Sequence, residues 1–540
     1  MSIFDTADFI LFTLYRGLLV YIILCFPFSL ALSQNGCVTL YGRHTSMKLL
    51  STLQIQEWDA YTIQQEPISA IDLMERAANA CVSLIISQAS VDSNIKIFCG
   101  KGNNGGDGLA IARQLIKKGF RVTPYIVELG SLGTTAFQTN LQQLHVVCKD
   151  IHFIQSDANF PIIHQTDIVV DALMGSGLSR PITGLYLSLI QHINSAAANV
   201  ISIDVPTGLL IDQCSAGNTI IKANTTLTFQ SFKLCFLAAE NALFFGQIIV
   251  VDIQLNPSFL TFLETSYSMV EVLQIKTMLQ RRLPFSHKGN FGHALLIAGG
   301  IGKMGAAILS AKACLRSGVG LLTAAIPKNT EQILHNALPE LMVELRDTKV
   351  LDYTPYAAIG IGPGIGTDEI MQQNLQQLLK QYQKPIVLDA DALNIIALNP
   401  SWLANIPAGS ILTPHPKEFD RLFGKSNNEF DRWQKALVAS LQFNCVILVK
   451  GHYTLIANNG KGWFNNTGNV GLAKGGSGDI LTGIITALLA QGYRSENAAL
   501  LGVYLHGLAA DISLDKQSVE SLLASDTIES IGKAFTYLHS

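Results

Sequence analysis

The chain is 540 residues long, enough for two large α/β domains or for three to four domains of ordinary size. Charged residues make up 14% of it and apolar residues 49%, which excludes an intrinsically disordered protein. The formal net charge is −3, so no overall attraction to nucleic acid or to an anionic membrane is expected. The cysteines are scattered and form no C-x-x-C pair, which favours reduced, buried thiols in a cytoplasmic protein over a zinc site or a disulfide framework.

The first 46 residues form a hydrophobic extension that differs from the rest of the chain. Its uninterrupted apolar part, from Gly17 to Leu32, is shorter than the ~20 residues of a membrane-spanning helix. Acidic residues precede Arg16, whereas a secretory signal begins with basic ones. Three interpretations stay open: a misplaced start codon with Met47 as the true start, a signal peptide, or an anchor. Membrane contact is expected only if this extension is made.

Beyond Met47, apolar spacing predicts two helices, at residues 53–63 and 69–87. Short β-like runs then alternate with helical patterns, one of which covers residues 109–118. The predicted strands of this series are residues 95–98, 122–127, 168–170, 200–203 and 248–251. Such alternation indicates a parallel sheet with crossover helices.

A segment with a helical pattern, residues 257–284, is predicted to join this domain to a second one of the same class. The predicted strands of the second series are residues 294–297, 321–326, 358–361, 385–388, 411–412 and 446–449. The sequence therefore predicts two consecutive α/β domains. The first, over residues 47–263, is expected to be a Rossmann-like three-layer domain, and the second covers residues 270–540.

A glycine-rich loop at residues 99–108 follows the first predicted strand and opens a helix. It contains G-x-G-x-x-G, a pattern in which backbone N–H groups at a helix N-terminus bind phosphate. The pattern alone is equally typical of a plain glycine turn. Asn103, Asn104 and Asp107 add polar groups that a turn does not need, and they favour a binding loop.

Two later loops offer matching chemistry, because Asp171 follows one predicted strand and Asp204 and Thr207 follow another. Ligands of open α/β sheets bind beyond the carboxyl ends of the strands, so the three loops are expected to converge on one crevice. Oxygen atoms from these residues and from Asn104 suit a hard cation better than zinc. For each aspartate alone, a helix cap is an equally good interpretation.

In the second half, the glycine-rich residues 466–479 precede an apolar helix. Such a loop forms an anion site, and Asp479 in the first turn is placed to accept a proton from a hydroxyl that attacks a phosphoryl group. A capping carboxylate is the alternative. Lys450, directly after a strand, is placed to reach nucleotide phosphates, although no P-loop motif is present. His415, between two prolines, points to the same crevice, although a lone histidine is more often structural.

The blocks G-K-G-N-N-G-G-D-G, D-A-L-M-G-S-G-L-S-R-P and D-V-P-T-G resemble the epimerase domain of the bifunctional NAD(P)H-hydrate repair enzymes. The resemblance implies that two loops hold the damaged dinucleotide, NADHX or NADPHX, and that Asp204 is a catalytic residue at its nicotinamide end. The implied binding residues are Asn103, Asn104, Gly105, Gly106, Asp107, Gly175, Ser176, Gly177, Leu178, Ser179, Arg180, Pro181 and Asp204. It also implies a potassium ion bound by Asn104, Asp171 and Thr207, where Thr207 replaces the serine of many relatives.

The second half resembles the dehydratase partner of the same enzymes, a member of the ribokinase-like superfamily. Further matching blocks lie at residues 287–293, 305–307, 362–366 and 388–394. The implied contacts of the hydrated nucleotide are Ala306, Gly364, His415 and the catalytic Asp479. The implied ADP-binding residues, with Mg²⁺ accompanying the nucleotide, are Lys450, Gly451, His452, Tyr453, Thr454 and Gly478. Both domains on one chain is the prokaryotic arrangement, which implies ADP rather than ATP.

The resemblance implies metabolite repair: interconversion of R and S epimers of hydrated NAD(P)H, and dehydration of the S form as ADP becomes AMP and phosphate. Three alternatives stay open. An NAD-dependent dehydrogenase is suggested by Glu128, which lies near the expected place of a ribose-binding acid. A small-molecule kinase shares the G-S-G-D block, and a non-catalytic nucleotide-binding protein is the third. A homo-oligomer is expected from the mean hydropathy of +0.31.

Overall fold

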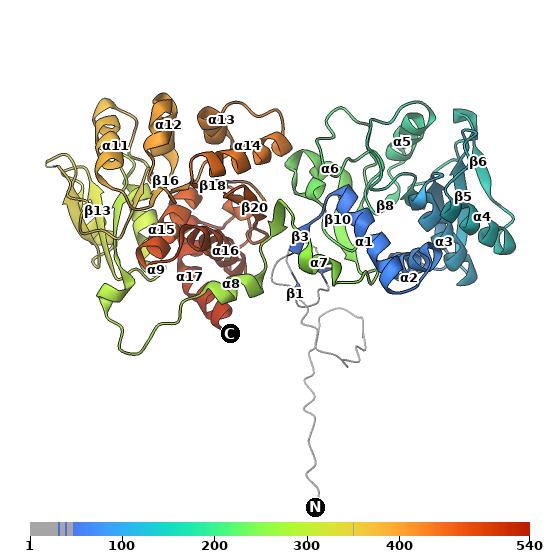
Figure 1. Cartoon of the computed structure of the whole chain (residues 1–540), viewed down its shortest axis with the longest axis horizontal. Helices are drawn as coiled ribbons and strands as arrows, with labels where there is room; N and C mark the ends of the chain where they lie inside the picture. Colours follow the sequence, from blue (N-terminus) through green and yellow to red (C-terminus); the bar gives the residue numbers. More distant parts are fainter. Residues whose placement is uncertain (1–30, 33–37, 40–46, 349) are drawn as a thin grey trace, which may run out of the picture.

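In the computed structural model, the structure describes residues 31–32, 38–39, 47–348 and 350–540. Most of the N-terminal extension, with its three interpretations, lies outside these residues. Two short strands in it, β1 (Ala31–Leu32) and β2 (Val38–Thr39), pair antiparallel. Within the described ranges, no helix has both the length and the apolar character needed to cross a membrane. From Met47 onward the chain forms two lobes that lie side by side, each built on its own sheet (Figure 1).

The chain enters the first lobe through two helices, α1 (Thr52–Gln65) and α2 (Ala70–Gln88), as predicted. Each begins at a serine, Ser51 or Ser69, whose side chain accepts a backbone N–H three residues later. The side chain of that later residue bonds back to the serine N–H, which completes a capping box. The apolar face of α2 is buried against the sheet.

The first sheet has seven parallel strands in the order β10-β9-β8-β7-β4-β5-β6. Its strands are β4 (Asn94–Cys99), β5 (Arg121–Val127), β6 (His152–Ile154), β7 (Ile168–Ala172), β8 (Asn199–Ile203), β9 (Thr225–Phe229) and β10 (Gln247–Val251). Five of these were predicted. Strands β6 and β9 were missed, since β6 is short and β9 carries three threonines in place of a continuous apolar run.

Helices cover both faces of this sheet, which confirms the three-layer, Rossmann-like prediction. Side chains alternate along β4, so that Ile95 and Ile97 pack with α2 and α3 (Asn103–Lys117). Phe98 faces the opposite layer, where α5 (Leu185–Ser195) packs. The helix predicted at residues 109–118 is α3, which begins six residues earlier, at Asn103 inside the glycine-rich loop.

The second sheet has eleven strands in the order β14-β13-β12-β15-β16-β17-β18-β19-β20-β11-β3. Its first seven strands in this order are parallel, and β18, β19 and β20 form an antiparallel meander. The predicted strands are β12 (His293–Ile297), β13 (Leu321–Ile326), β15 (Ala358–Ile361), β16 (Ile386–Leu388), β17 (Ile411–Leu412) and β18 (Val446–Val449). The strands not predicted are β14 (Met342–Leu345), β19 (Leu455–Asn458), β20 (Lys461–Phe464), β11 (Tyr267–Met269) and β3 (Met47–Leu49).

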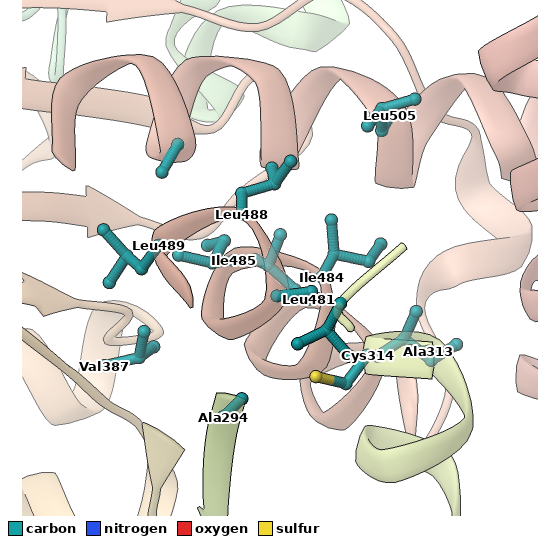
Figure 2. Close-up of a cluster of buried hydrophobic side chains, with 14 of the residues drawn as sticks. Ala294, Ala313, Cys314, Val387, Leu481, Ile484, Ile485, Leu488, Leu489 and Leu505 are labelled. Carbon is teal, nitrogen blue, oxygen red and sulfur yellow. The ribbon is translucent and has the colours of Figure 1, made fainter. Parts of the chain in front are cut away.

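The main core of the second lobe surrounds α15 (Ser477–Ala490), the helix that the second glycine-rich loop opens. It packs against α9 (Met304–Arg316) and α16 (Ser495–Ser513). Figure 2 shows part of this cluster, with side chains of α15, α9, α16, β12 and β16, among them Leu481, Ile484, Ile485, Leu488, Leu489, Ala313, Cys314, Leu505, Ala294 and Val387. A rigid apolar helix therefore supports the loop.

The opposite face of this sheet is covered by α11 (Glu369–Gln381) and α12 (Ala390–Leu398). Its core uses the alternate side chains of the same strands, such as Leu295 and Ile297 of β12. The second domain is therefore also α/β with helices on both faces, as predicted.

The junction between the lobes contains both helix and strand. The predicted helical segment 257–284 holds the short helices α7 (Phe259–Phe262) and α8 (Val272–Met278) with β11 between them. Strand β3 pairs antiparallel with β11 at the edge of the second sheet, although α1 follows directly and packs on the first. Figure 1 shows β3 between the lobes. The boundaries at residues 47–263 and 270–540 stay predictions.

Candidate active sites

A cavity of about 470 Å³ lies beyond the carboxyl ends of β4, β7 and β8. The three loops that the sequence pointed to converge there. The lining residues that had been predicted as site residues are Asn103, Asn104, Asp107, Gly175, Ser176, Gly177, Leu178 and Asp204. The floor and rim are completed by residues not predicted, including Trp58 and Asp59 of α1 and Lys101.

The glycine-rich loop folds back so that Gly105 lies against Gly100, near the start of the loop. A Cβ at Gly105 would lie 1.8 Å from the carbonyl oxygen of Gly100, so only glycine fits there. A Cβ at Gly106 would lie 2.9 Å from the sulfur of Met74. Neither Gly105 nor Gly106 lines the cavity, and both serve the packing that turns the loop into α3.

Asn104 is the loop residue that lacks a partner. Its side chain is 9% exposed, and among the residues that the structure describes neither its amide oxygen nor its amide nitrogen has a hydrogen-bond partner. A Cβ at Gly175 would lie 3.1 Å from the Asn104 oxygen and 3.1 Å from Asp204 Oδ2, so both polar groups meet at this glycine. A buried amide without a partner is costly unless a ligand satisfies it.

Asp204 is bound by a lysine and by a backbone N–H. Its Oδ1 lies 2.8 Å from Nζ of Lys233, a fully buried lysine, and its Oδ2 accepts the Ser176 N–H at 3.0 Å. Burial acts to raise the pKa of Asp204, but the Lys233 charge and the Ser176 bonds outweigh it and hold this pKa below its ordinary value. The backbone of Asp204 has φ of 69°, a strained conformation for a residue with a side chain. A held, charged carboxylate thus faces the cavity.

Asp171 and Thr207 are fully buried and do not line the cavity. The Thr207 hydroxyl donates to Asp171 Oδ1 at 2.6 Å, and Ser202 and the Thr207 N–H donate to Oδ2. The Leu173 N–H is a fourth donor to this carboxylate. The predicted cation ligands are therefore not equivalent, because Asp171 already accepts four hydrogen bonds whereas Asn104 accepts none.

Two further acids face the same cavity. Burial, reinforced by the charge of Asp204, raises the pKa of Asp59 to about 7, although Lys233 acts to lower it. Burial, with the charges of Asp204 and Asp59, also raises the pKa of Asp107 well above its usual range. Asp59 and Lys233 were missed from the sequence, because neither stands in a glycine-rich block and an acid or lysine in an amphipathic segment gives no distinctive signal.

Some predicted residues lie outside this cavity. Ser179, Arg180 and Pro181 are exposed and do not line it. Glu128, which had suggested a dehydrogenase, contacts the Lys101 ammonium and accepts the Gly130 N–H at 2.9 Å. Its carboxylate therefore organises the loop after β5.

A second cavity, of about 640 Å³, lies in the other lobe at the start of α15. The predicted residues that line it are His415, Lys450, Gly451, His452, Thr454 and Gly478. A Cβ at Gly478 would lie 3.5 Å from Lys450 Nζ, so the glycine lets the lysine approach the helix N-terminus. Gly476, just before the helix, has φ of 93°, which glycine alone adopts without strain. An ammonium and a helix N-terminus thus face one cavity, as anion binding requires.

Asp479 lies in the first turn of α15. Burial raises its pKa to about 6, and the negative charges of Asp389 and Asp391 act in the same direction against Lys450. A carboxylate with a pKa near neutrality is suited to take up a proton.

Lys450 is fixed by a residue that the sequence analysis had not chosen. Its Nζ lies 2.9 Å from Oδ1 of the buried Asp389, which also accepts hydrogen bonds from Thr413 and Thr482 at 2.7 Å each. Asp389 stands in the matched block at residues 388–394, directly after a predicted strand. Its position at the carboxyl end of a predicted strand, where ligands of α/β sheets bind, could have identified Asp389 from the sequence.

The other predicted residues of this lobe are distributed more widely. His415 caps α13 (Pro416–Phe423), where its Nδ1 accepts the N–H groups of Lys417 and Glu418. Tyr453 faces a different cavity, of about 350 Å³, between the lobes. Ala306 and Gly364 adjoin each other, because a Cβ at Gly364 would lie 3.2 Å from that of Ala306. Neither residue lines the cavity at α15.

Comparison with known proteins assigns both halves. Residues 294–533 match the family model described as NAD(P)H-hydrate dehydratase, and residues 70–235 match the model described as YjeF-related protein N-terminus. The chain is 35% identical to the bifunctional NAD(P)H-hydrate repair enzyme Nnr of Coxiella burnetii, over 88% of this chain and 97% of that one. The chain belongs to this family of repair enzymes.

Other relatives of this repair enzyme agree. The Nnr enzyme of Moorella thermoacetica is 32% identical, over 89% of this chain and 96% of that one. Among solved structures, the ADP/ATP-dependent NAD(P)H-hydrate dehydratase of Bacillus subtilis, co-crystallised with ATP and Mg²⁺, is 34% identical. It covers 50% of this chain and 98% of its own, with a TM-score of 0.46. The full-length relatives and the family models confirm the family suggested by the glycine-rich blocks, and the kinase interpretation is not favoured.

Proposed function

We propose that this chain restores hydrated NADH and NADPH at two separate sites. The first lobe would interconvert the R and S epimers, and the second would dehydrate the S epimer as ADP becomes AMP and phosphate. The observation that carries the proposal is that residues of the glycine-rich motifs of each lobe line a cavity in that lobe. Asn104, Asp107 and Asp204 meet in the first, and Lys450 and Gly478 meet in the second beside Asp479.

At the second site, the chemistry converts a poor leaving group into a good one. Asp479 would take the proton from the hydroxyl at carbon 6 as that oxygen attacks the β-phosphorus of ADP and the bond to AMP breaks. Phosphate then leaves with the electron pair of the C6–O bond, and loss of the carbon 5 proton restores the double bond. Lys450 and the N–H groups at the start of α15 are placed to stabilise the phosphates. Magnesium bound with ADP would supply further charge neutralisation.

At the first site, Asp204 would contact the nicotinamide end of the substrate as a fixed negative charge. Its carboxylate stays ionised because Lys233 and Ser176 hold it, and it faces the cavity. Asn103, Ser176 and the loop N–H groups would hold the dinucleotide. Epimerisation needs no redox partner, since the two forms differ only in configuration at carbon 6.

We further propose a potassium ion in the first lobe, with Asn104 as its distinguishing ligand. The buried amide oxygen of Asn104 fits a hard cation, and Asp171, near the end of β7, and Thr207, after β8, would complete its ligands. The expected result is that K⁺ in place of Na⁺ raises the melting temperature of the full chain but not that of Asn104→Leu. Equal shifts in both proteins would contradict this assignment.

The experiment that tests the two-site function is spectroscopic. The full chain is mixed with R and S hydrated NADH, Mg²⁺, K⁺ and ADP, and the return of NADH absorbance is followed. Complete recovery is expected, since the dehydratase alone would stop when the S epimer is consumed. Recovery that stalls part-way would contradict the epimerase, and no recovery would contradict the dehydratase.

We also propose that the enzyme works in the cytoplasm as a homo-oligomer. The cysteines of the described residues from Met47 onward are free, and all except Cys214 are buried, as suits a reducing compartment. Light scattering of the full chain tests the assembly, and a mass equal to one chain would contradict it.

A further inference from the structure

The repair reaction at the first site needs a group that moves a proton on the substrate, and Asp204 is poorly suited to this. Its carboxylate is bound to Lys233 Nζ at 2.8 Å and to the Ser176 N–H at 3.0 Å. The fully buried ammonium of Lys233 stabilises the charged form and opposes protonation. A carboxyl group that exchanges protons readily must be sought elsewhere on the cavity wall.

Asp59 on α1 lines the same cavity. Its helix is fixed at this place by Trp58, whose Nε1 donates to the Asn256 carbonyl at 2.7 Å, and by Thr62, whose hydroxyl accepts the Asn256 N–H at 3.0 Å. In the part of the chain that the structure describes, no hydrogen bond or ion pair to the Asp59 carboxylate is found. The position of Asp59 is thus fixed through its helix, and its carboxylate oxygens are available to a ligand.

The negative charges around Asp59 exceed the positive charge that offsets them. Asp107 from α3 and Asp204 from the end of β8 face it, and Lys233 is the cation that offsets them. Because Lys233 is bound to Asp204, burial and the remaining negative charge raise the pKa of Asp59 to about 7. Both the acid and the base form of Asp59 are therefore populated near neutral pH.

A second observation indicates that a ligand occupies this place. The Asn104 amide lines the same cavity and is 9% exposed, and its oxygen and nitrogen have no hydrogen-bond partner within the described ranges of the chain. A polar group buried in this way is satisfied when a polar ligand enters. The acids therefore surround a binding cavity and are not an isolated surface cluster.

We propose that Asp59 is a catalytic residue of the epimerase, which takes the proton from the carbon 6 hydroxyl of the substrate and returns it to ring nitrogen N1. This inference rests on the proposed function. Asp59 lies before the residues matched by the epimerase-side family model, 70–235.

The step balances without any further reactant. As Asp59 removes the hydroxyl proton, the O–H pair forms the C6=O bond, the C6–N1 bond breaks and its electron pair stays on N1. The carboxylic acid just formed gives its proton to N1. Rotation about the C5–C6 bond turns the other face of the carbonyl toward N1, and the reverse sequence closes the ring as the opposite epimer. One carboxyl group with a pKa near neutrality suits both transfers.

The test compares Asp59→Asn with the wild-type full chain, and Glu57→Gln serves as the control because Glu57 is an exposed acid on the same helix. Epimerisation is measured by separating R and S hydrated NADH, and dehydration by giving S hydrated NADH with ADP. We expect Asp59→Asn to lower kcat of epimerisation at least ~100-fold with KM nearly unchanged. Dehydration should stay at the wild-type rate, an unchanged melting temperature of the first lobe would show that the variant is folded, and Glu57→Gln should change neither activity.

Two results would overturn the proposal. Epimerisation by Asp59→Asn within threefold of wild type would remove Asp59 from the proton transfer, and a raised KM with unchanged kcat would make it a binding residue. Asp59→Glu, which retains the carboxyl group, should recover part of the activity, and recovery no better than with asparagine would contradict proton transfer. If the wild-type chain itself fails to epimerise, the proposed function fails instead.

Discussion

The ammonium of Lys450 lies 2.9 Å from Oδ1 of Asp389. Lys450 directly follows β18 and Asp389 directly follows β16, so this ion pair connects the ends of the two strands. Asp389 is 1% exposed, so its charge has little water to stabilise it. Two threonines and one lysine replace that water. The lysine proposed to bind ADP is therefore also the counter-ion of a buried carboxylate, and the two roles can be separated by measurement.

Lys450→Met should destabilise the fold, because it leaves Asp389 buried without its cation. The loss of a partner from a buried ion pair costs about 3 kcal/mol. Asp389→Asn in the same chain should recover most of this loss, while dehydration remains absent in both proteins. Urea unfolding of the single and double variants measures it. Equal stabilities for Lys450→Met and wild type would show that the pair contributes nothing to folding.

Asp479→Asn should abolish dehydration and leave epimerisation intact. The amide keeps the size of the side chain but cannot take the substrate proton, and removal of a general base costs about 10²- to 10⁴-fold in rate. Assays of S hydrated NADH with ADP and of epimer exchange, on the same preparation, measure the two effects. Loss of both activities together would contradict two independent sites.

Dehydration should also depend on pH through Asp479. Its pKa is raised to about 6 by burial and by the neighbouring carboxylates, and the ionised form is the one that accepts a proton. Activity should therefore fall as pH drops below about 6 and reach a plateau above it. The pH profile of kcat/KM with S hydrated NADH reports this value for the free enzyme. A rate that increases as pH falls would assign the opposite role, that of an acid.

Gly483→Ala should destabilise the second lobe. A Cβ at this position on α15 would lie 2.1 Å from the Ser310 carbonyl oxygen of α9, so the two helices must separate. Overpacking of this kind costs about 1–3 kcal/mol. Gly532→Ala is the matched control, because it lies in α17 (Ala524–His539) with no atom within 4 Å of the new methyl group. Thermal unfolding should show a lower melting temperature for the first variant and an equal or slightly higher one for the second.

Much of the fold could be predicted because buried parallel strands are continuous apolar runs, as at β4 and β12. The strands that were missed are edge or antiparallel strands, or are rich in threonine. Strand β20, for example, alternates exposed Lys461 with buried Gly462, and pairs through its backbone with a partner distant in sequence. Such pairing depends on tertiary contacts that local periodicity does not contain.

The candidate sites show a similar division. Residues that stand in glycine-rich loops, such as Asn104 and Gly478, were found because the loop geometry requires a recognisable pattern. Asp59, which lines the first cavity, and Lys233, which binds Asp204 behind its wall, come from segments without such a pattern, 174 residues apart in the chain. Only the folded arrangement brings their charges together, so composition and spacing could not identify them.

Strand β3 has a consequence for how the chain is synthesised. It is completed by β11, whose residues leave the ribosome more than 200 positions later. Domains generally fold in the order of synthesis. Helices α1 and α2 can therefore pack on the first sheet before the strand that pairs with β3 has been made. Strand β3 is thus the earliest translated strand of the second sheet, yet it can pair only after β11 has been made. A nascent chain truncated between Leu263 and Tyr267 would therefore carry β3 without the strand that pairs with it.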